Sequence, residues 1–208
     1  MMLIRLRFQL VSRSRWVLLL ASVLSVTLGL SNCAGRTYKP VVRYSVNPKI
    51  ETPRVEATEK LLAIRPLEAA QPYKLKIVYR ESDYVLGNYP DVEWAELPRD
   101  VVTRALQDAL SSSGRFRDVG LAGNLGVPDL ILTGQLRRFE EVRAPEGAVA
   151  LCEVRLELRE AIGGKGRWTA TLSAKEPLQA ADLPSLAAAM SRAVEKVVQE
   201  SVVAICKQ

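Results

Sequence analysis

Two stretches of strict apolar–polar alternation, joined by glycines, constrain the fold of this 208-residue chain more than any other feature. The first, "CEVRLELRE", covers residues 152–160, and the second, "RWTATLSAK", covers residues 167–175. A period of two places apolar side chains on one face of a β-strand and polar ones on the other. Because Gly163, Gly164 and Gly166 lie between the two stretches, we predict an antiparallel hairpin with one buried face.

Two longer stretches change to the period of an amphipathic helix. Residues 98–114, "PRDVVTRALQDALSSSG", begin with a proline and end with a glycine, as helices commonly do. Residues 183–205 carry a second apolar stripe, and Asp182 is available as the N-cap of this helix. One-sided helices and strands with solvated outer faces predict an α+β fold. We expect a two-layer domain in which a largely antiparallel mixed sheet carries both amphipathic helices on one face.

Three further segments complete the predicted sheet. Residues 60–68 and 73–80 have the composition of strands, and the second alternates regularly. Residues 128–142, "PDLILTGQLRRFEEV", are apolar over enough of their length to form a central strand. We interpret the charged residues of "RRFEE" (137–141), together with Arg80, as side chains that meet water.

The first 32 residues have the pattern of a secretory signal peptide. The start is basic and lacks acidic residues, and residues 16–30 form an uncharged apolar run. This run is shorter than the roughly twenty residues that span a bilayer. We therefore assign residues 1–32 to a signal peptide, residues 33–59 to the start of the mature chain and a proline-containing tether, and residues 60–208 to the folded domain. Within the tether, "VVRYSV" (41–46) is a candidate short strand.

The residues after this run resemble the lipobox of bacterial lipoproteins. Leu30, Ser31 and Asn32 precede Cys33, with asparagine where Gly, Ala or Ser is usual. The resemblance implies that Cys33 receives a diacylglycerol on its sulfur and becomes the first residue of the mature chain, which its acyl chains anchor to a membrane. Ordinary secretion with an incidental cysteine and an uncleaved signal anchor are the alternatives.

The composition excludes several classes of catalytic chemistry. The chain contains no histidine, which excludes Ser-His-Asp and Cys-His catalysis and all histidine-containing metal sites. Four arginines but no acidic residue precede Cys33, so the rest of the chain has a net charge of only +2, and nucleic-acid binding is not indicated. No phosphate-binding P-loop motif occurs. We predict that the protein is not an enzyme and uses no cofactor or metal.

Several short motifs together resemble the ABC-type transport auxiliary lipoproteins. They are "IVYR" at 77–80, "WAELP" at 94–98, "SGRFRDV" at 113–119, and a later pattern formed by Asp129, Leu132, Gly134 and Phe139. The motifs follow one another in the order and spacing of that family over residues 60–205. The lipobox precedes them and the second predicted helix follows them, as is typical of the family.

The resemblance implies a non-enzymatic function at the outer membrane, facing the periplasm. Such lipoproteins are docking partners of an MCE protein assembly, and an ABC permease with its ATPase completes the transport system. Phospholipids or other hydrophobic molecules pass between the two membranes through it. A homo-oligomer is compatible with this function. The alternatives are a lipoprotein that scaffolds or activates peptidoglycan or lipopolysaccharide assembly, and a carrier with an apolar cavity beneath its helices.

An aromatic-rich segment supplies the candidate partner interface. Tyr84, Tyr89 and Trp94 lie among loop-like residues, and exposed Tyr and Trp residues are common in interface hot spots. The alternative is that these aromatics are half-buried on the strands of a hairpin.

Cys152 and Cys206 are the candidates for a disulfide. Both fall on predicted inward-facing stripes, one on a strand and one on a helix, and an oxidising periplasm permits pairing. The alternative is two separate buried thiols, because the sequence does not determine whether the two Cα atoms come within about 7 Å.

Overall fold

A computed structural model describes residues 40–208, so the predicted signal peptide and Cys33 lie outside the described residues. This part of the chain contains two helices and nine strands, which pair into one sheet. The helices are α2 (Pro98–Ser112) and α3 (Leu183–Cys206). The strands are β1 (Val42–Tyr44), β2 (Thr58–Ile64), β3 (Glu68–Ala69), β4 (Lys76–Ser82), β5 (Val85–Trp94), β6 (Phe116–Leu121), β7 (Leu130–Ala144), β8 (Gly147–Glu160) and β9 (Gly166–Pro177).

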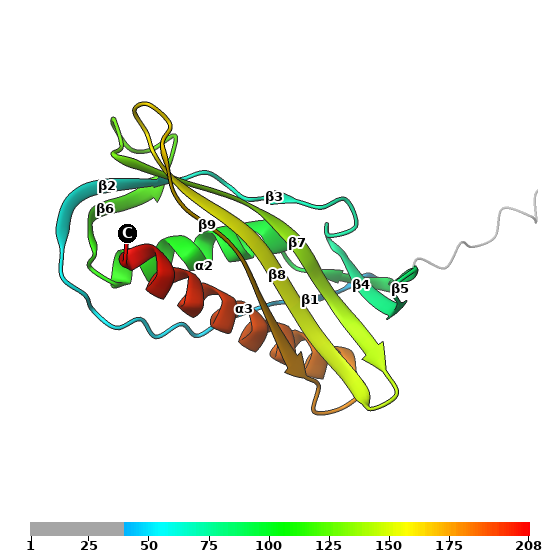
Figure 1. Cartoon of the computed structure of the whole chain (residues 1–208). Coiled ribbons are helices and arrows are strands. Elements are labelled where there is room, and N and C mark those ends of the chain that lie inside the picture. The colour runs from blue at the N-terminus through cyan, green and yellow to red at the C-terminus, as the bar shows by residue number, and fades with distance from the viewer. Residues whose placement is uncertain (1–39) are drawn as a thin grey trace, which may run out of the picture. The chain divides into compact units, whose positions relative to one another are not determined.

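Strand β7 organises the sheet (Figure 1). One of its edges pairs with β8 in antiparallel register, from Leu130 opposite Glu160 to Ala144 opposite Gly147. The other edge is shared in series by β2, β3 and β4, which all run parallel to β7. The central strand predicted over 128–142 is therefore confirmed, with its pairing partners drawn from distant parts of the chain.

The α+β fold class is also confirmed. β8 and β9 form the predicted antiparallel hairpin, and the apolar residues of the first predicted strand are all buried, namely Cys152, Val154, Leu156 and Leu158. The ladders β7–β8 and β8–β9 are the longest in the sheet. Five shorter pairings are parallel, so the sheet is more mixed than the alternating strands alone indicate.

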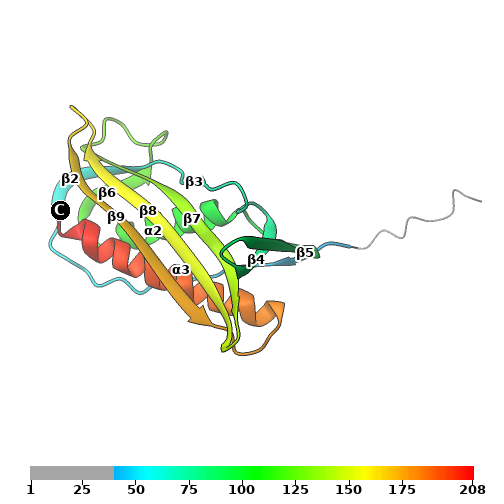
Figure 2. The same ribbon diagram turned by 45° about the vertical axis from the view of Figure 1, so that its right-hand side comes forward.

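Both predicted helices are present and cover one face of the sheet (Figures 1 and 2). α2 begins at Pro98, which lacks the N–H that would have no partner in a first helical turn. Gly114 follows this helix with φ 67°, a conformation that glycine adopts without steric cost. α3 is capped by Asp182, whose carboxylate accepts a hydrogen bond of 2.7 Å from the backbone N–H of Ser185.

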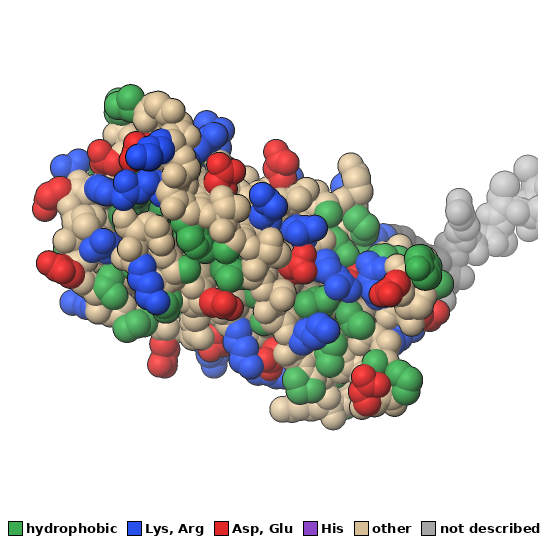
Figure 3. All heavy atoms as spheres, viewed as in Figure 1, with side chains coloured by type: hydrophobic (Ala, Val, Ile, Leu, Met, Phe, Trp, Pro, Cys, Tyr) green, Lys and Arg blue, Asp and Glu red, His purple; other side chains and the backbone are tan. Residues whose placement is uncertain are grey.

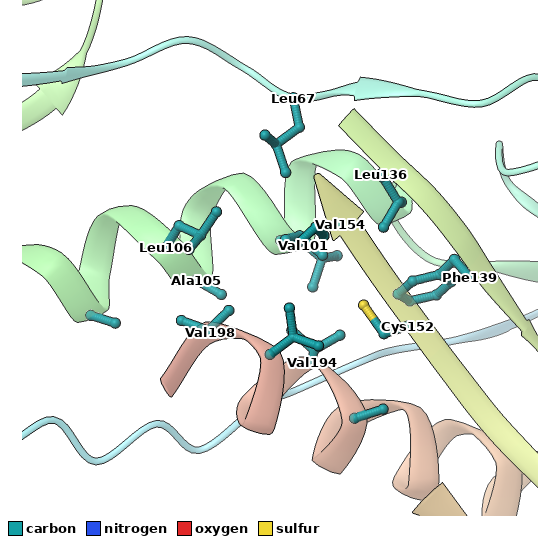
Figure 4. Close-up of a cluster of buried hydrophobic side chains, with 14 of the residues drawn as sticks. Leu67, Val101, Ala105, Leu106, Leu136, Phe139, Cys152, Val154, Val194 and Val198 are labelled. Atoms are coloured by element: carbon teal, nitrogen blue, oxygen red, sulfur yellow. The ribbon is translucent and has the colours of Figure 1, made fainter. Parts of the chain in front are cut away.

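The two helices and the inner face of the sheet share one hydrophobic core (Figure 4). Phe139 and Val154 come from the sheet, Val101 from α2, and Val194 and Val198 from α3, and all of them are buried. Burying one such side chain contributes roughly 1.5–3 kcal/mol. This packing fixes the helices to the sheet and leaves strand-end turns as the main exposed apolar positions.

The described part of the predicted tether packs on the domain, which corrects the predicted domain boundary at residue 60. β1 pairs in parallel with β5, so that Tyr44 lies opposite Trp94. Val46 is buried in the core, and the backbone N–H of Asn47 donates a 3.0 Å hydrogen bond to Ser191 on α3. The compact unit accordingly comprises Pro40–Gln208.

The long strands give the domain two distinct ends (Figures 1 and 2). The Pro40 end holds the start of the described chain, the turn between β4 and β5, and the turn between β7 and β8. The Val127 end holds the loop of residues 122–129 and the turn of residues 161–165 between β8 and β9.

Candidate docking surface

The three aromatic residues predicted as a partner interface do not share a surface. Tyr84 is 96% exposed, Tyr89 is half-buried, and Trp94 is only 3% exposed. Trp94 packs edge-to-face against Phe139, with ring centroids 5.5 Å apart. The prediction is therefore wrong for Trp94, which belongs to the core, and only Tyr84 is fully available to a partner.

A bulge in β5 contains Tyr89 and separates Tyr84 from Trp94. Lys76 of β4 lies opposite Glu93, but Val78 lies opposite Asn88, so β5 carries three extra residues between these two pairs. Asp91, inside this stretch, has φ 57°. Bulges bend a strand and change the direction of its side chains, which explains why Trp94 faces the core while the residues before the bulge lie nearer the surface.

Tyr89 belongs to a polar cluster at the surface of the sheet. Its hydroxyl donates a short hydrogen bond to Glu141 and accepts one of 2.9 Å from Arg143. The Arg143 guanidinium also lies over the Tyr79 ring, 3.7 Å from its centroid, and the Tyr79 and Tyr89 rings meet edge-to-face. Burial, followed by the hydrogen bond to Glu141, raises the pKa of Tyr89.

Glu140 is the centre of a second, more deeply buried cluster. Its side chain is fully buried and accepts hydrogen bonds from the Tyr73 hydroxyl (2.6 Å), Arg80 Nε (2.8 Å) and Arg138 Nε (2.7 Å). Burial alone would raise the pKa of Glu140, but these three donors hold it below its usual value. Burial and the bond to Glu140 raise the pKa of Tyr73 to about 12.

These clusters correct the interpretation that Arg80 and the charges of 137–141 simply meet water. Glu140 and Glu141 are 1% and 5% exposed, because the parallel strand β4 pairs with β7 at this point. One local signal could have revealed the arrangement. Arg138 precedes Glu140 by two residues and Arg143 follows Glu141 by two, so each pair shares one face of the strand.

The turn between β4 and β5 exposes three consecutive apolar residues. Tyr84 is almost fully exposed, and Val85 and Leu86 are 48% and 40% exposed. Arg80, which is held by buried Glu140, donates from Nη1 to the backbone oxygen of Asp83 at 3.2 Å. The turn is therefore connected to the core through one arginine. In Figure 3, hydrophobic side chains are visible on the protruding part of the molecule at the Pro40 end.

The Val127 end carries a second exposed apolar pair. Val127 and Ile162 are 77% and 80% exposed. The loop and the turn that present them are joined by a 2.9 Å hydrogen bond from the backbone N–H of Ala161 to the backbone oxygen of Asp129. Two large apolar side chains thus project from a connected pair of segments.

Two depressions of the surface mix polar with apolar side chains and lie outside the helix–sheet interface. The one of about 410 Å³ is lined by residues that include Arg65, Glu68 and Arg155, and one of about 300 Å³ by residues that include Arg104 and Asp108. The apolar crevice beside Trp94 and Phe139 has no room for a water molecule. Within residues 40–208, no group of side chains is suited to a metal ion, and no helix is long and apolar enough to cross a membrane.

Cys152 and Cys206 are free thiols in this structure. Cys152 lies beside Val194 of α3 in the core (Figure 4). Cys206 is twelve residues further along the helix, a rise of about 18 Å, and its sulfur lies 3.7 Å from the Ser113 hydroxyl. The arrangement favours the alternative of two separate thiols.

Comparison with protein families decides the identity. The model of the ABC-type transport auxiliary lipoprotein component matches residues 44–201. The chain belongs to this family. As a member of it, the protein is a lipoprotein associated with an ABC-type transport system. The match also begins within the first strand, in agreement with a domain that starts near Pro40.

Solved structures share the fold of this auxiliary lipoprotein. Protein XCC0632 from Xanthomonas campestris is 24% identical, with a TM-score of 0.66, and the alignment covers 82% of this chain and 96% of that one. A crystal structure of an uncharacterised protein is 15% identical, with a TM-score of 0.58, covering 76% of this chain and 98% of that one. A search of curated proteins finds no match.

Proposed function

We propose that this auxiliary lipoprotein is anchored through Cys33 in the outer membrane, faces the periplasm, and acts by protein docking without catalysing a reaction. Its partner is the MCE-domain protein of an ABC transport system that moves phospholipid or other hydrophobic molecules across the envelope. The family match and the lipobox-like sequence around Cys33 support this proposal.

The filled interface between sheet and helices is the observation that carries the proposal. A carrier would need an apolar cavity beneath the helices, as lipid-sized ligands are mostly enclosed by apolar side chains. Phe139, Val154 and Val194 fill that position instead. The most exposed large apolar side chains, Tyr84, Val127 and Ile162, lie at turns and loops, where binding residues on rigid scaffolds commonly lie.

The Val127 end is the best candidate for the protein contact. The mature chain enters the domain at the Pro40 end, so a short anchor keeps that end near the membrane and leaves the opposite end accessible from the periplasm. Val127 and Ile162 supply exposed apolar anchors there. Truncating a central interface anchor commonly costs about 2 kcal/mol or more, roughly a thirtyfold loss of affinity.

Affinity capture tests the proposal. The purified mature protein should bind the MCE-domain protein, and Ile162→Asp should weaken the complex by roughly thirtyfold. Val42→Asp is the matched control, because Val42 on β1 is also an exposed aliphatic residue but lies at the Pro40 end. Equal binding by both variants would place the contact elsewhere. No binding by the native protein would refute the docking function.

The neighbouring genes separate this function from the alternative of a scaffold for another envelope machine. Adjacent genes for an ATPase, a permease and an MCE protein are expected. A neighbouring cell-wall or lipopolysaccharide synthesis gene in their place would favour the alternative.

A further inference from the structure

The three exposed residues Tyr84, Val85 and Leu86 lie at the end of the domain from which the mature chain extends. β1 runs parallel to β5, with Val42 opposite Val92. Because the two strands are parallel, the residues that precede Val42 and those that precede Val92 lie toward the same end of the domain. Pro40 lies there before β1, and the β4–β5 turn lies there before β5. Figures 1 and 2 show the start of β1 and this hairpin side by side at the Pro40 end.

The length of chain before Pro40 limits how far this end can lie from a lipid anchor. Cys33 precedes Pro40 by seven residues, and seven residues span at most about 23–25 Å when fully extended. The β4–β5 hairpin extends four residues beyond Val78, to Ser82 at its turn. This extension is about 13 Å long. The extension of the turn is therefore shorter than the maximum reach of the anchor segment, so the turn can meet the membrane in which Cys33 is anchored.

The chemistry of the turn matches the headgroup region of a bilayer. A tyrosine ring is amphipathic and favours the membrane–water interface, and Val85 and Leu86 are aliphatic residues that stay partly exposed in the domain. Glu81 and Asp83 flank the turn, so attraction to anionic lipids is not expected to dominate. The Arg80 contact to Asp83 holds the turn in shape before any membrane contact, which lowers the entropic cost of binding.

We propose that the Tyr84–Val85–Leu86 turn inserts its side chains into the headgroup region of the membrane in which Cys33 is anchored. This inference rests on the lipid anchoring within the proposed function. It gives the Pro40 end a second membrane contact, which restricts the orientation of the domain and directs the Val127 end away from the bilayer.

Tryptophan quenching in vesicles tests the contact. The full lipidated protein is reconstituted into phosphatidylcholine and phosphatidylethanolamine vesicles that contain lipids with a quencher near the headgroup. Tyr84→Trp is compared with Ile162→Trp, since both sites are highly exposed turn positions at opposite ends. The native chain, with its own tryptophans unchanged, provides the background. We expect loss of emission and a blue shift for Tyr84→Trp, little change for Ile162→Trp, and the same result at high salt.

The outcomes separate this inference from the proposed function. If neither variant is quenched, or both are quenched equally, the proposed membrane contact is wrong even though the protein floats with the vesicles. If the protein does not float with vesicles at all, the anchoring through Cys33 fails, and the contact fails with it. If the MCE-domain protein shifts the emission of Tyr84→Trp without vesicles, the turn is a protein contact and the inference is overturned.

Discussion

Glu140→Gln tests whether the buried carboxylate cluster stabilises the domain. The substitution keeps the size of the side chain, so it creates no cavity, but it removes the charge. Tyr73, Arg80 and Arg138 all donate to Glu140 in the native protein. An amide replaces one of the two carboxylate oxygens with an N–H donor, so the donors that meet this oxygen in the native protein lose their acceptor.

The expected magnitude follows from the burial of each partner. Removing one partner of a buried ion pair commonly costs about 3–5 kcal/mol. The side chains of Arg80 and Arg138 are 16% and 34% exposed, so both can recover part of their hydration, and the lower end of the range applies. A loss of about 3 kcal/mol lowers Tm by about 6–12 °C in a domain of this size.

Urea unfolding and thermal unfolding of the native and variant proteins measure this loss. Glu153→Gln is the matched control, because Glu153 lies on the neighbouring strand β8 and pairs with Arg137 at 3.5 Å, where both side chains are partly exposed. Such surface pairs contribute about 0–1 kcal/mol. A Glu140→Gln variant as stable as Glu153→Gln would refute the stabilising function of the cluster.

The pH dependence provides a second test of the same cluster. The pKa of Glu140 in the folded protein lies below its usual 4.5, so below pH 4.5 the unfolded chain takes up a proton that the folded chain does not. Native stability therefore falls as the pH decreases from 4.5 toward the folded pKa. Glu140→Gln lacks this contribution, and the stability difference between the two proteins should shrink on acidification. A constant difference would contradict the assignment.

Three further predictions concern single residues. Cys33→Ser should abolish acylation and release the protein into the soluble periplasmic fraction, whereas a native mature protein with an unmodified first residue other than Cys33 would contradict the anchor. Thiol labelling of the denatured, unreduced protein should modify both Cys152 and Cys206. In the folded protein Cys206 should react first, because burial raises the pKa of Cys152 to about 12. Gly134→Ala should destabilise the domain by about 1–3 kcal/mol in urea unfolding, since a Cβ there would lie 2.5 Å from the backbone oxygen of Arg155; unchanged stability would show that the strands shift easily.

The elements predicted well from the sequence are those whose pattern is local. The alternation in 152–160 and 167–175 determined the β8–β9 hairpin, because both strands and their turn are contiguous. The two helices carry caps and apolar stripes within their own residues. The family resemblance also placed the motifs in the matched region 44–201.

The features that the sequence did not reveal depend on pairing between distant segments. Glu140 is buried because β4 pairs with β7 at Val78, more than sixty residues away in sequence. Trp94 faces the core because of the bulge in β5 around Asp91, which no alternating pattern indicates. A short strand at 41–46 is expected from the sequence, but its parallel pairing with β5 spans about fifty residues, and the prolines around it indicated a tether.

The same central strand connects the two ends to which we assign different contacts. β7 runs from Leu130 near the Val127 end to Ala144 near the Pro40 end, a length of about 45–50 Å at the rise of an antiparallel strand. β8 pairs with it over this whole length, so the two ends cannot move independently without breaking ladder hydrogen bonds. If the β4–β5 turn contacts the membrane, the rigid β7–β8 ladder holds Val127 and Ile162 at a distance of up to this length. A partner bound there would meet the domain well above the lipid headgroups, and lengthening the segment between Cys33 and Pro40 would then weaken membrane contact before it affects partner binding.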